Sequence, residues 1–125
     1  MRFLGLRENH HRHRANQNHQ FLQKLETSNI NQYDWMGTVV FYIALHRVRA
    51  KLASKIGLTR KKIGHEDLNR YVVRNFGQNV ATDYIFLYGE SRRLRYDLRI
   101  NEMINQATYN RYKDILLTSI FPATT

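Results

Sequence analysis

A long apolar segment that begins near Asp34 and stops at Gly57 constrains the fold more than any other part of the chain. It contains no proline, and apolar side chains recur along it at the spacing of one helix face. Aspartate commonly begins helices and glycine commonly ends them, so the pattern predicts a helix over 34–56. Such an apolar first half is typical of the central helix of a bundle. The positions expected to face the core are Trp35, Val39, Tyr42, Leu45, Leu52 and Ile56, with Met36, Val40 and Ile43 beside them.

Four further segments show helical periodicity. They cover residues 17–27, 65–76, 80–96 and 100–120. Gly77 is expected to end the second of them, and Asn101 or Asp97 to cap the last. No segment alternates apolar and polar residues as a strand does, and the single proline lies at position 122. The sequence therefore predicts an all-α protein, a single up-and-down bundle of four to five helices over residues 19–122.

The first residues lack this periodicity. His10, His11 and His13 stand there among arginines and asparagines. We expect a flexible basic arm over residues 1–18. A loose group of histidines does not define the geometry of metal ligands, so no metal site is expected.

Composition narrows the class of protein. The chain has 125 residues, enough for one domain with one core, and no cysteine, which excludes disulfides and thiolate chemistry. No apolar run approaches the length of a membrane span, and the first residues lack the apolar region of a signal peptide. We therefore expect a cytoplasmic protein with no membrane partner and no cofactor.

Basic residues dominate the charge. The formal net charge is +10, and no acidic residue lies between Asp34 and Glu66. Basic surfaces of this kind attract polyanions, with an affinity that falls steeply as salt rises. We expect RNA or a nucleotide as the partner. The residues expected to bind it are Arg47, Arg49, Lys51, Lys55, Arg60, Lys61, Lys62, Arg93 and Arg99.

A smaller set of residues carries the chemistry of a phosphate-transfer site. The candidate catalytic residues are His46, His65, Arg92, Arg95 and Tyr96. Histidine accepts a proton near neutral pH, a guanidinium stabilises charge on phosphate oxygens, and tyrosine adds a hydrogen bond or a weak acid. Helical spacing places His46 on one face with Tyr42 and Arg49, and it places the arginines and Tyr96 on another. We expect the two faces to meet.

Simpler interpretations of the same residues stay open. His46 on an apolar face is also typical of a core histidine bonded to a carbonyl or a tyrosine. His65 is also placed to start a helix, and the arginines after Ser91 suit the negative end of a helix dipole.

Two short segments and one histidine carry a resemblance to a known family. They are Asp34-Trp35 with Phe41–His46, then His65, then Ser91–Tyr96. Over residues 19–120 the chain resembles the HEPN superfamily of small helical-bundle domains, which occur in bacterial toxins, in phage defence and in RNA processing.

The resemblance implies a bundle of four or five helices that is often dimeric. In active members an arginine, four to six residues and a histidine form a metal-independent ribonuclease site, and two such sites meet across the dimer. The ribose 2′-OH attacks the adjacent phosphorus and yields a 2′,3′-cyclic phosphate. In this chain Arg60 and His65 have that arginine-to-histidine spacing. Arg92 does not, because no histidine follows it.

Three functions follow from these observations. The first is an RNA- or nucleotide-interacting HEPN-like protein, with metal-independent endoribonuclease activity as its catalytic form. The alternative is a non-catalytic antitoxin-like or scaffold protein that acts through a dimer interface and binds a cognate protein partner. The third is DNA binding by the two helices joined at Gly77, although the residues after Asn79 offer few groups that read bases.

Overall fold

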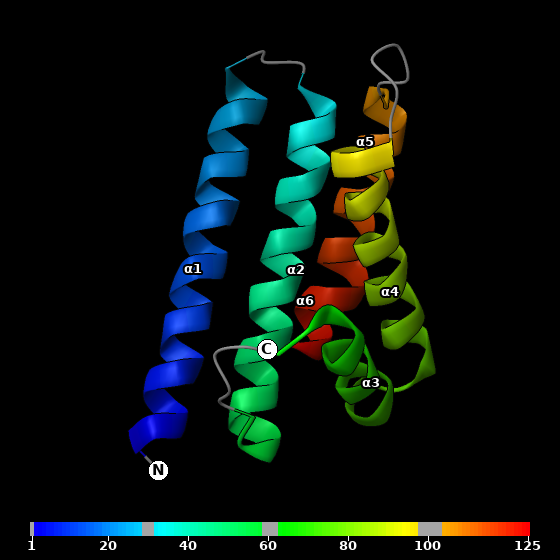
Figure 1. Ribbon diagram of the computed structural model, residues 1–125. Coiled ribbons are helices and arrows are strands. Elements are labelled where there is room, and N and C mark those ends of the chain that lie inside the picture. The colour runs from blue at the N-terminus through cyan, green and yellow to red at the C-terminus, as the bar shows by residue number, and fades with distance from the viewer. Residues whose placement is uncertain (1, 29–31, 59–62, 98–103) are drawn as a thin grey trace.

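The regular structure is entirely helical in the residues that the computed structural model describes, which are 2–28, 32–58, 63–97 and 104–125 (Figure 1). The elements are α1 (Arg2–Thr27), α2 (Tyr33–Ile56), α3 (His65–Phe76), α4 (Gln78–Arg92), the π-helical turn η1 (Arg93–Asp97), α5 (Gln106–Ile115), the π-helical turn η2 (Leu116–Ile120) and α6 (Phe121–Ala123). The all-α bundle expected from the sequence is confirmed.

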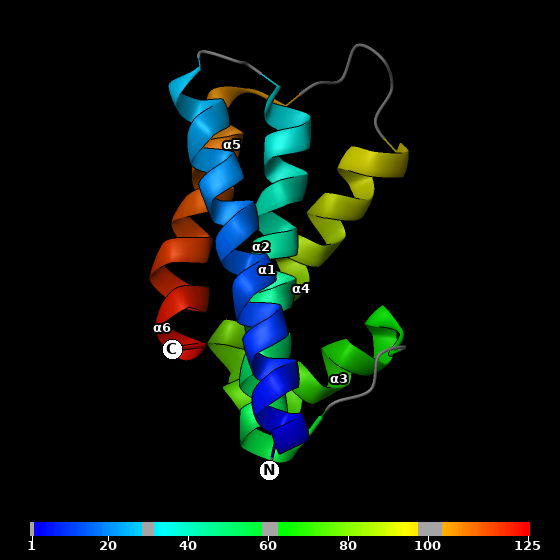
Figure 2. The ribbon, with the colours of Figure 1, turned by 90° about the vertical axis from the view of Figure 1, so that its left-hand side faces the viewer.

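α2 runs through the middle of the bundle (Figure 1). α1 lies antiparallel to it on one side, and α4 and α5 lie on the other. α3 is short and crosses near the lower end of α2. Turned by 90°, the bundle shows α1 in front of α2, with the C-terminal helices on one side and α4 with α3 on the other (Figure 2). The chain therefore runs up and down, as expected.

α2 is central because it is apolar on almost every side. Buried residues recur through it from Met36 to Ala53. The missing side chain of Gly37 permits close packing, since a Cβ atom there would lie 2.9 Å from Leu94 Cδ1 of η1 and 3.1 Å from Tyr112 Cδ2 of α5. The helix ends at Gly57, whose φ of 71° gives the left-handed conformation expected of a glycine at this place.

Three expectations for α2 need correction. Trp35 at the start of α2 is 65 % exposed, and Ile56 at its end is 43 % exposed. Both side chains lie on the side of the helix that is not covered by its neighbours. Asp34 does not cap the helix, since Gln32 occupies that position. Instead, the Asp34 carboxylate accepts the backbone N–H of Ile104 at 2.9 Å, which ties the segment before α5 to the start of α2.

The irregular arm expected over residues 1–18 is helical instead, as part of α1. Its buried residues His11, Ala15 and Leu22 are separated by four and seven positions, so they lie on one face, against α2. The half-buried Asn18 and Leu25 continue that face. Polar residues occupy positions that usually hold apolar ones, and for this reason hydrophobic periodicity did not reveal the first half of α1.

The second half of the chain differs from expectation at element boundaries. α4 begins at Gln78 and gives way to the π-helical η1, where one helix over 80–96 is expected. The last long helix begins at Gln106, and its cap is Asn105, whose side chain accepts the N–H of Thr108 at 2.9 Å. Asp97 is thus not the cap, and Asn101 lies outside the described residues.

Tyrosines fill much of the core on the α4–α5 side. Tyr84, Tyr109 and Tyr112 are buried, as expected for core aromatics. The hydroxyl of Tyr109 donates to Glu26 at 3.1 Å, and that of Tyr112 donates to Glu90 at 3.0 Å. None of the helices in the described residues is both long enough and apolar enough to span a bilayer.

Candidate functional site

A cavity of about 280 Å³ opens where the start of α3 meets α4 and η1. Its lining residues are His65, Tyr88, Arg92, Arg95 and Tyr96. Four of these are candidate catalytic residues from the sequence, and they meet although His65 lies on a separate helix. No carboxylate is among the described residues that line the cavity. The site therefore offers cations, an imidazole and phenols to a ligand.

Local structure explains why these side chains converge. α3 begins directly after Gly64, so His65 occupies the first position of that helix. Tyr88, Arg92, Arg95 and Tyr96 follow the spacing i, i+4, i+7 and i+8, which places them on one face. The last two lie on η1, whose π-helical winding is a feature often found at functional sites.

Arg95 is the most firmly held of the cavity residues. Its Nη1 donates to the hydroxyl of Tyr42 at 2.9 Å, and its Nε donates to the carbonyl of Ser91 at 3.1 Å. Its guanidinium carbon lies 5.6 Å from the ring centroid of Tyr42 and 5.1 Å from that of Tyr96. In the described part of the chain these contacts orient the guanidinium through neutral groups, which leave its positive charge in place for an anion.

Arg92 and Arg93 are neighbours with different surroundings. Arg92 is exposed, and its Nη1 donates to the hydroxyl of Tyr88 at 3.2 Å. Arg93 forms an ion pair with Glu90 at 2.9 Å, and its Nη2 donates to the hydroxyl of Tyr112 at 3.4 Å. The Glu90 hydrogen bond raises the pKa of Arg93. Arg93, expected to bind nucleic acid, does not line the cavity.

His65 presents a neutral imidazole to this cationic cavity. Its pKa is lowered first by burial and then by Arg95, Arg49 and Arg92. Its ring centroid lies 5.0 Å from that of Tyr88 and 6.0 Å from that of Phe41. The Nδ1 atom is buried and has no hydrogen-bond partner among the described residues. A neutral ring in this place is able to accept a proton at neutral pH.

The structure does not bring His46 to the cavity. Its Nδ1 lies 3.0 Å from Nδ1 of His11 on α1, and the two rings stack with centroids 5.2 Å apart. The pKa of His46 is lowered to about 4, mainly by burial and then by the charges of Arg14 and Arg49. The core-histidine interpretation fits this placement, although its partner is another histidine instead of a carbonyl or a tyrosine.

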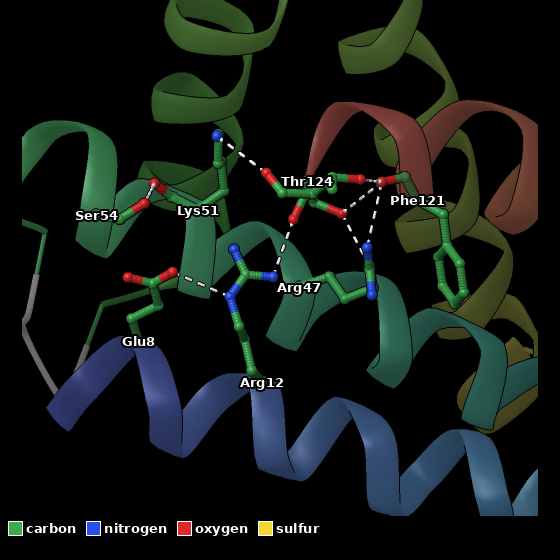
Figure 3. Close-up of polar contacts among 8 residues, drawn as sticks. Glu8, Arg12, Arg47, Lys51, Ser54, Phe121 and Thr124 are labelled. Atoms are coloured by element: carbon green, nitrogen blue, oxygen red, sulfur yellow. Dashed lines mark hydrogen bonds and ion pairs between the residues drawn. The ribbon is translucent and has the colours of Figure 1, made fainter. Parts of the chain in front are cut away.

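Two of the basic residues on α2, Arg47 and Lys51, are held by the C-terminal end of the chain (Figure 3). Arg47 Nε donates to the hydroxyl of Thr124 at 2.9 Å, and its guanidinium carbon lies 4.0 Å from the ring centroid of Phe121. Lys51 donates to the carbonyl of Thr125 at 3.1 Å. From α1, Arg12 donates to the carbonyl of Thr124 at 3.1 Å. These side chains stabilise the last turn of the fold.

The remaining residues expected to bind nucleic acid fall into two groups. Arg49 and Lys55 donate to the carbonyls of Ile63 and Asn75, which joins α2 to the beginning and the end of α3. The others lie outside the described residues; they are Arg60, Lys61, Lys62 and Arg99. Of the two residues that match the ribonuclease spacing, the structure therefore describes only His65.

Sequence reasoning missed two tyrosines of the site. Tyr88 was not among the candidate residues, yet it is half-buried and lines the cavity. Tyr42 holds Arg95 from α2. The spacing of Tyr88 to Arg92 was a signal that could have placed it at the site. Tyr42 was not among the candidate residues, although helical spacing placed it on the face expected to meet the arginines, and its contact with Arg95 agrees with that expectation.

Comparisons with protein-family models, with curated proteins and with solved structures found no match. In the described residues, no group of three or more His, Cys, Asp or Glu side chains is arranged to hold a metal ion.

Proposed function

We propose that this chain is an RNA- or nucleotide-interacting protein of the HEPN type, and that the cavity at His65 is its phosphate site. The observation that carries the proposal is the convergence of Arg92 and Arg95 with this imidazole in one cavity. Two guanidiniums that line one cavity attract an anion, and phosphate matches their fork of donors best.

Arg95 is the main phosphate ligand in this proposal. It is oriented before any ligand arrives, because Tyr42 and Ser91 hold two of its nitrogens. A ligand therefore pays little of the entropy needed to order a long side chain. Arg92 is more exposed and adds a second charge at the mouth of the cavity. The net charge of +10 draws the polyanion toward the protein.

The neutral state of His65 also supports a catalytic form of this proposal, a metal-independent endoribonuclease. His65 takes the proton of the ribose 2′-OH as the 2′-oxygen bonds to phosphorus, and the bond from phosphorus to the 5′-oxygen breaks. The leaving 5′-oxygen takes a proton from Tyr88 or from water. Arg95 stabilises the charge that develops on the phosphate oxygens. The products are a 2′,3′-cyclic phosphate and a 5′-OH.

The binding proposal is tested with Arg95→Gln and Arg92→Gln, measured by fluorescence anisotropy with a labelled single-stranded RNA. We expect Arg95→Gln to weaken binding about 10- to 100-fold, since a hydrogen bond to a charged group contributes roughly 1.5–3 kcal/mol. Arg92→Gln should weaken it less, because that side chain is more exposed. Arg93→Gln is the matched control, with the same change of charge one residue away and an expected effect under about twofold.

The outcome against the proposal is equal affinity for wild type and Arg95→Gln, or an equal loss in all three variants. An equal loss would mean that binding follows net charge and not the cavity. Circular dichroism checks that each variant keeps its helices.

The catalytic form is tested by incubating the RNA with chelator present and analysing the ends of the products. We expect cyclic phosphate ends from wild type and none from His65→Gln, which has an amide in place of the imidazole. If wild type yields no product under any condition, the catalytic form is wrong and the binding proposal stands by itself.

The scaffold alternative makes different predictions. It requires a stable oligomer in gel filtration and a protein partner whose binding is unchanged by Arg95→Gln. A chain that binds no RNA but meets both conditions would favour that alternative.

A further inference from the structure

Tyr96 stands out among the cavity residues because the residue is 70 % exposed. Tyr88, the other phenol of the lining, is half-buried and packs against His65. Among the ring and cation contacts described, the Tyr96 ring meets only the Arg95 guanidinium, 5.1 Å from its centroid. One face of the ring is thus against a cation, and its exposure leaves the other face to solvent.

The position of this ring is set by the residue beneath it. Arg95 is itself held by the Tyr42 hydroxyl and by the Ser91 carbonyl. Its guanidinium carbon lies 5.6 Å from the ring centroid of Tyr42 and 5.1 Å from that of Tyr96. A cation on one face of an aromatic ring is attracted to it, which limits how the ring moves. Tyr96 therefore offers a flat apolar surface with a defined place beside the cations.

We infer that Tyr96 is a stacking platform for an unpaired nucleobase whose adjoining phosphate lies at Arg92 and Arg95; this rests on the proposed function. A nucleobase is planar and stacks on exposed aromatic rings regardless of its identity. Bases inside a duplex already stack on each other and are not available to a side chain. The ligand is therefore single-stranded RNA or a free nucleotide, and duplex RNA is disfavoured.

The chemistry assigned to Tyr96 differs from that expected from the sequence. A weak acid or hydrogen-bond donor needs the hydroxyl, whereas a platform needs only the ring. Tyr96→Phe removes the hydroxyl and keeps the ring, and Tyr96→Ala removes both. The two variants therefore separate the two roles.

The test compares probes that carry the same phosphates with and without bases. The first pair is a labelled single-stranded RNA and an abasic strand of equal length. The second pair is adenosine 5′-monophosphate and ribose 5-phosphate, measured by calorimetry. Duplex RNA of the same sequence completes the set. Phe21→Ala is the control variant, since Phe21 is an exposed aromatic residue on α1, 49 % accessible.

We expect Tyr96→Ala to weaken binding of the base-containing strand about 5- to 100-fold, because stacking on an aromatic side chain contributes roughly 1–3 kcal/mol per base. Binding of the abasic strand should change less than about twofold. Tyr96→Phe and Phe21→Ala should bind like wild type, and wild type should prefer the single strand over the duplex. If the base strengthens binding of adenosine 5′-monophosphate over ribose 5-phosphate but not binding of the RNA strand over the abasic strand, the ligand is a free nucleotide.

The platform is disproved if Tyr96→Ala loses the same factor with the abasic strand, since the ring would then act only through Arg95. It is also disproved if Tyr96→Ala loses nothing while Arg95→Gln does, and the phosphate site would survive that result. If neither variant loses affinity, the proposed function fails together with the platform.

Discussion

At the scale of single residues, the two histidines between α1 and α2 share one hydrogen bond. Their Nδ1 atoms lie 3.0 Å apart, so one donates while the other accepts. Two protonated rings would bring two donors and two charges together. The pKa of His11 is lowered to about 4 by burial, then by His46 and Arg49, with His10 and Arg7 adding less. Burial, Arg14, Arg49 and His10 lower the pKa of His46 to about 4.

This pair is expected to make the stability of the fold depend on pH. Both groups have a lower pKa in the folded chain than the ordinary 6.5, so unfolding takes up protons once the pH falls below that value. The stabilisation is complete above about pH 6.5 and declines as the pH approaches about 4. The loss should amount to roughly 2–4 kcal/mol. Thermal unfolding followed by circular dichroism across this range measures it.

The matched variants are the double change His11→Leu with His46→Leu, and His13→Gln on the exposed side of α1. The double variant should flatten the pH dependence, and His13→Gln should keep it. A double variant that loses stability between pH 6.5 and 4 as steeply as wild type would contradict the role of the pair.

Helical spacing predicted correctly that Arg92, Arg95 and Tyr96 share a face, because that spacing is a property of the backbone alone. The placement of His65 beside them depends on how α3 packs, which spacing does not determine. His46 was expected beside the same arginines. It lies elsewhere because α1 covers that face of α2, and the sequence pattern did not indicate that α1 extends so far.

At the scale of elements, α2 packs closely against its neighbours at Gly37. A Cβ atom there would lie 3.1 Å from Cδ2 of the buried Tyr112 ring and 2.9 Å from Leu94 Cδ1. We expect Gly37→Ala to lose roughly 1–3 kcal/mol through overpacking, which outweighs the gain of about 1 kcal/mol for alanine in a helix. Denaturant unfolding measures the difference. Because Leu94 belongs to η1, the variant should also weaken RNA binding.

Gly89 is the matched control, because it lies inside α4 and a Cβ atom there would meet nothing within 4 Å. Gly89→Ala should gain roughly 0.5–1 kcal/mol. If Gly37→Ala is as stable as Gly89→Ala, the close packing of α2 against α5 and η1 is not as described.

The C-terminal end depends on Arg47, whose Nη2 also donates to the carbonyl of Phe121 at 3.2 Å. Arg47→Met keeps much of the side-chain volume and removes these donors from Thr124 and Phe121. We expect a loss of roughly 1–3 kcal/mol in stability, since buried acceptors are left unpaired. RNA affinity should change less than about twofold. An unchanged melting temperature together with a tenfold loss of RNA affinity would restore the nucleic-acid role expected from the sequence.

Element type was easier to predict than element boundaries. The helix over 65–76 was predicted correctly at both ends, because Gly64 and Gly77 flank it. The first half of α1 was missed since its buried positions hold His11 and Asn18, which hydrophobic periodicity does not count. The π-helical η1 was read as ordinary helix, because sequence spacing does not distinguish the two windings.

At the scale of the whole molecule, the distribution of charge explains why one cavity is the candidate site. The chain carries a net charge of +10, but the described cations on α2 are bonded to backbone carbonyls or to a threonine hydroxyl. Their charges strengthen the positive field around the protein while their donors stabilise the fold. The cations of the cavity differ because Arg92 and Arg95 line one hollow together with His65, so both charges act on the same place.

The central claim, that phosphate binds beside His65 and not beside His46, is tested most directly by nuclear magnetic resonance of the histidine rings. Adenosine 5′-monophosphate or a short single-stranded RNA is added to the histidine-labelled protein. We expect the His65 ring signals to shift until they saturate, with a rise in the pKa of His65 as the anion offsets the nearby arginines. The His11 and His46 signals should stay in place. Saturating ligand that moves His46 and leaves His65 unchanged would contradict the account.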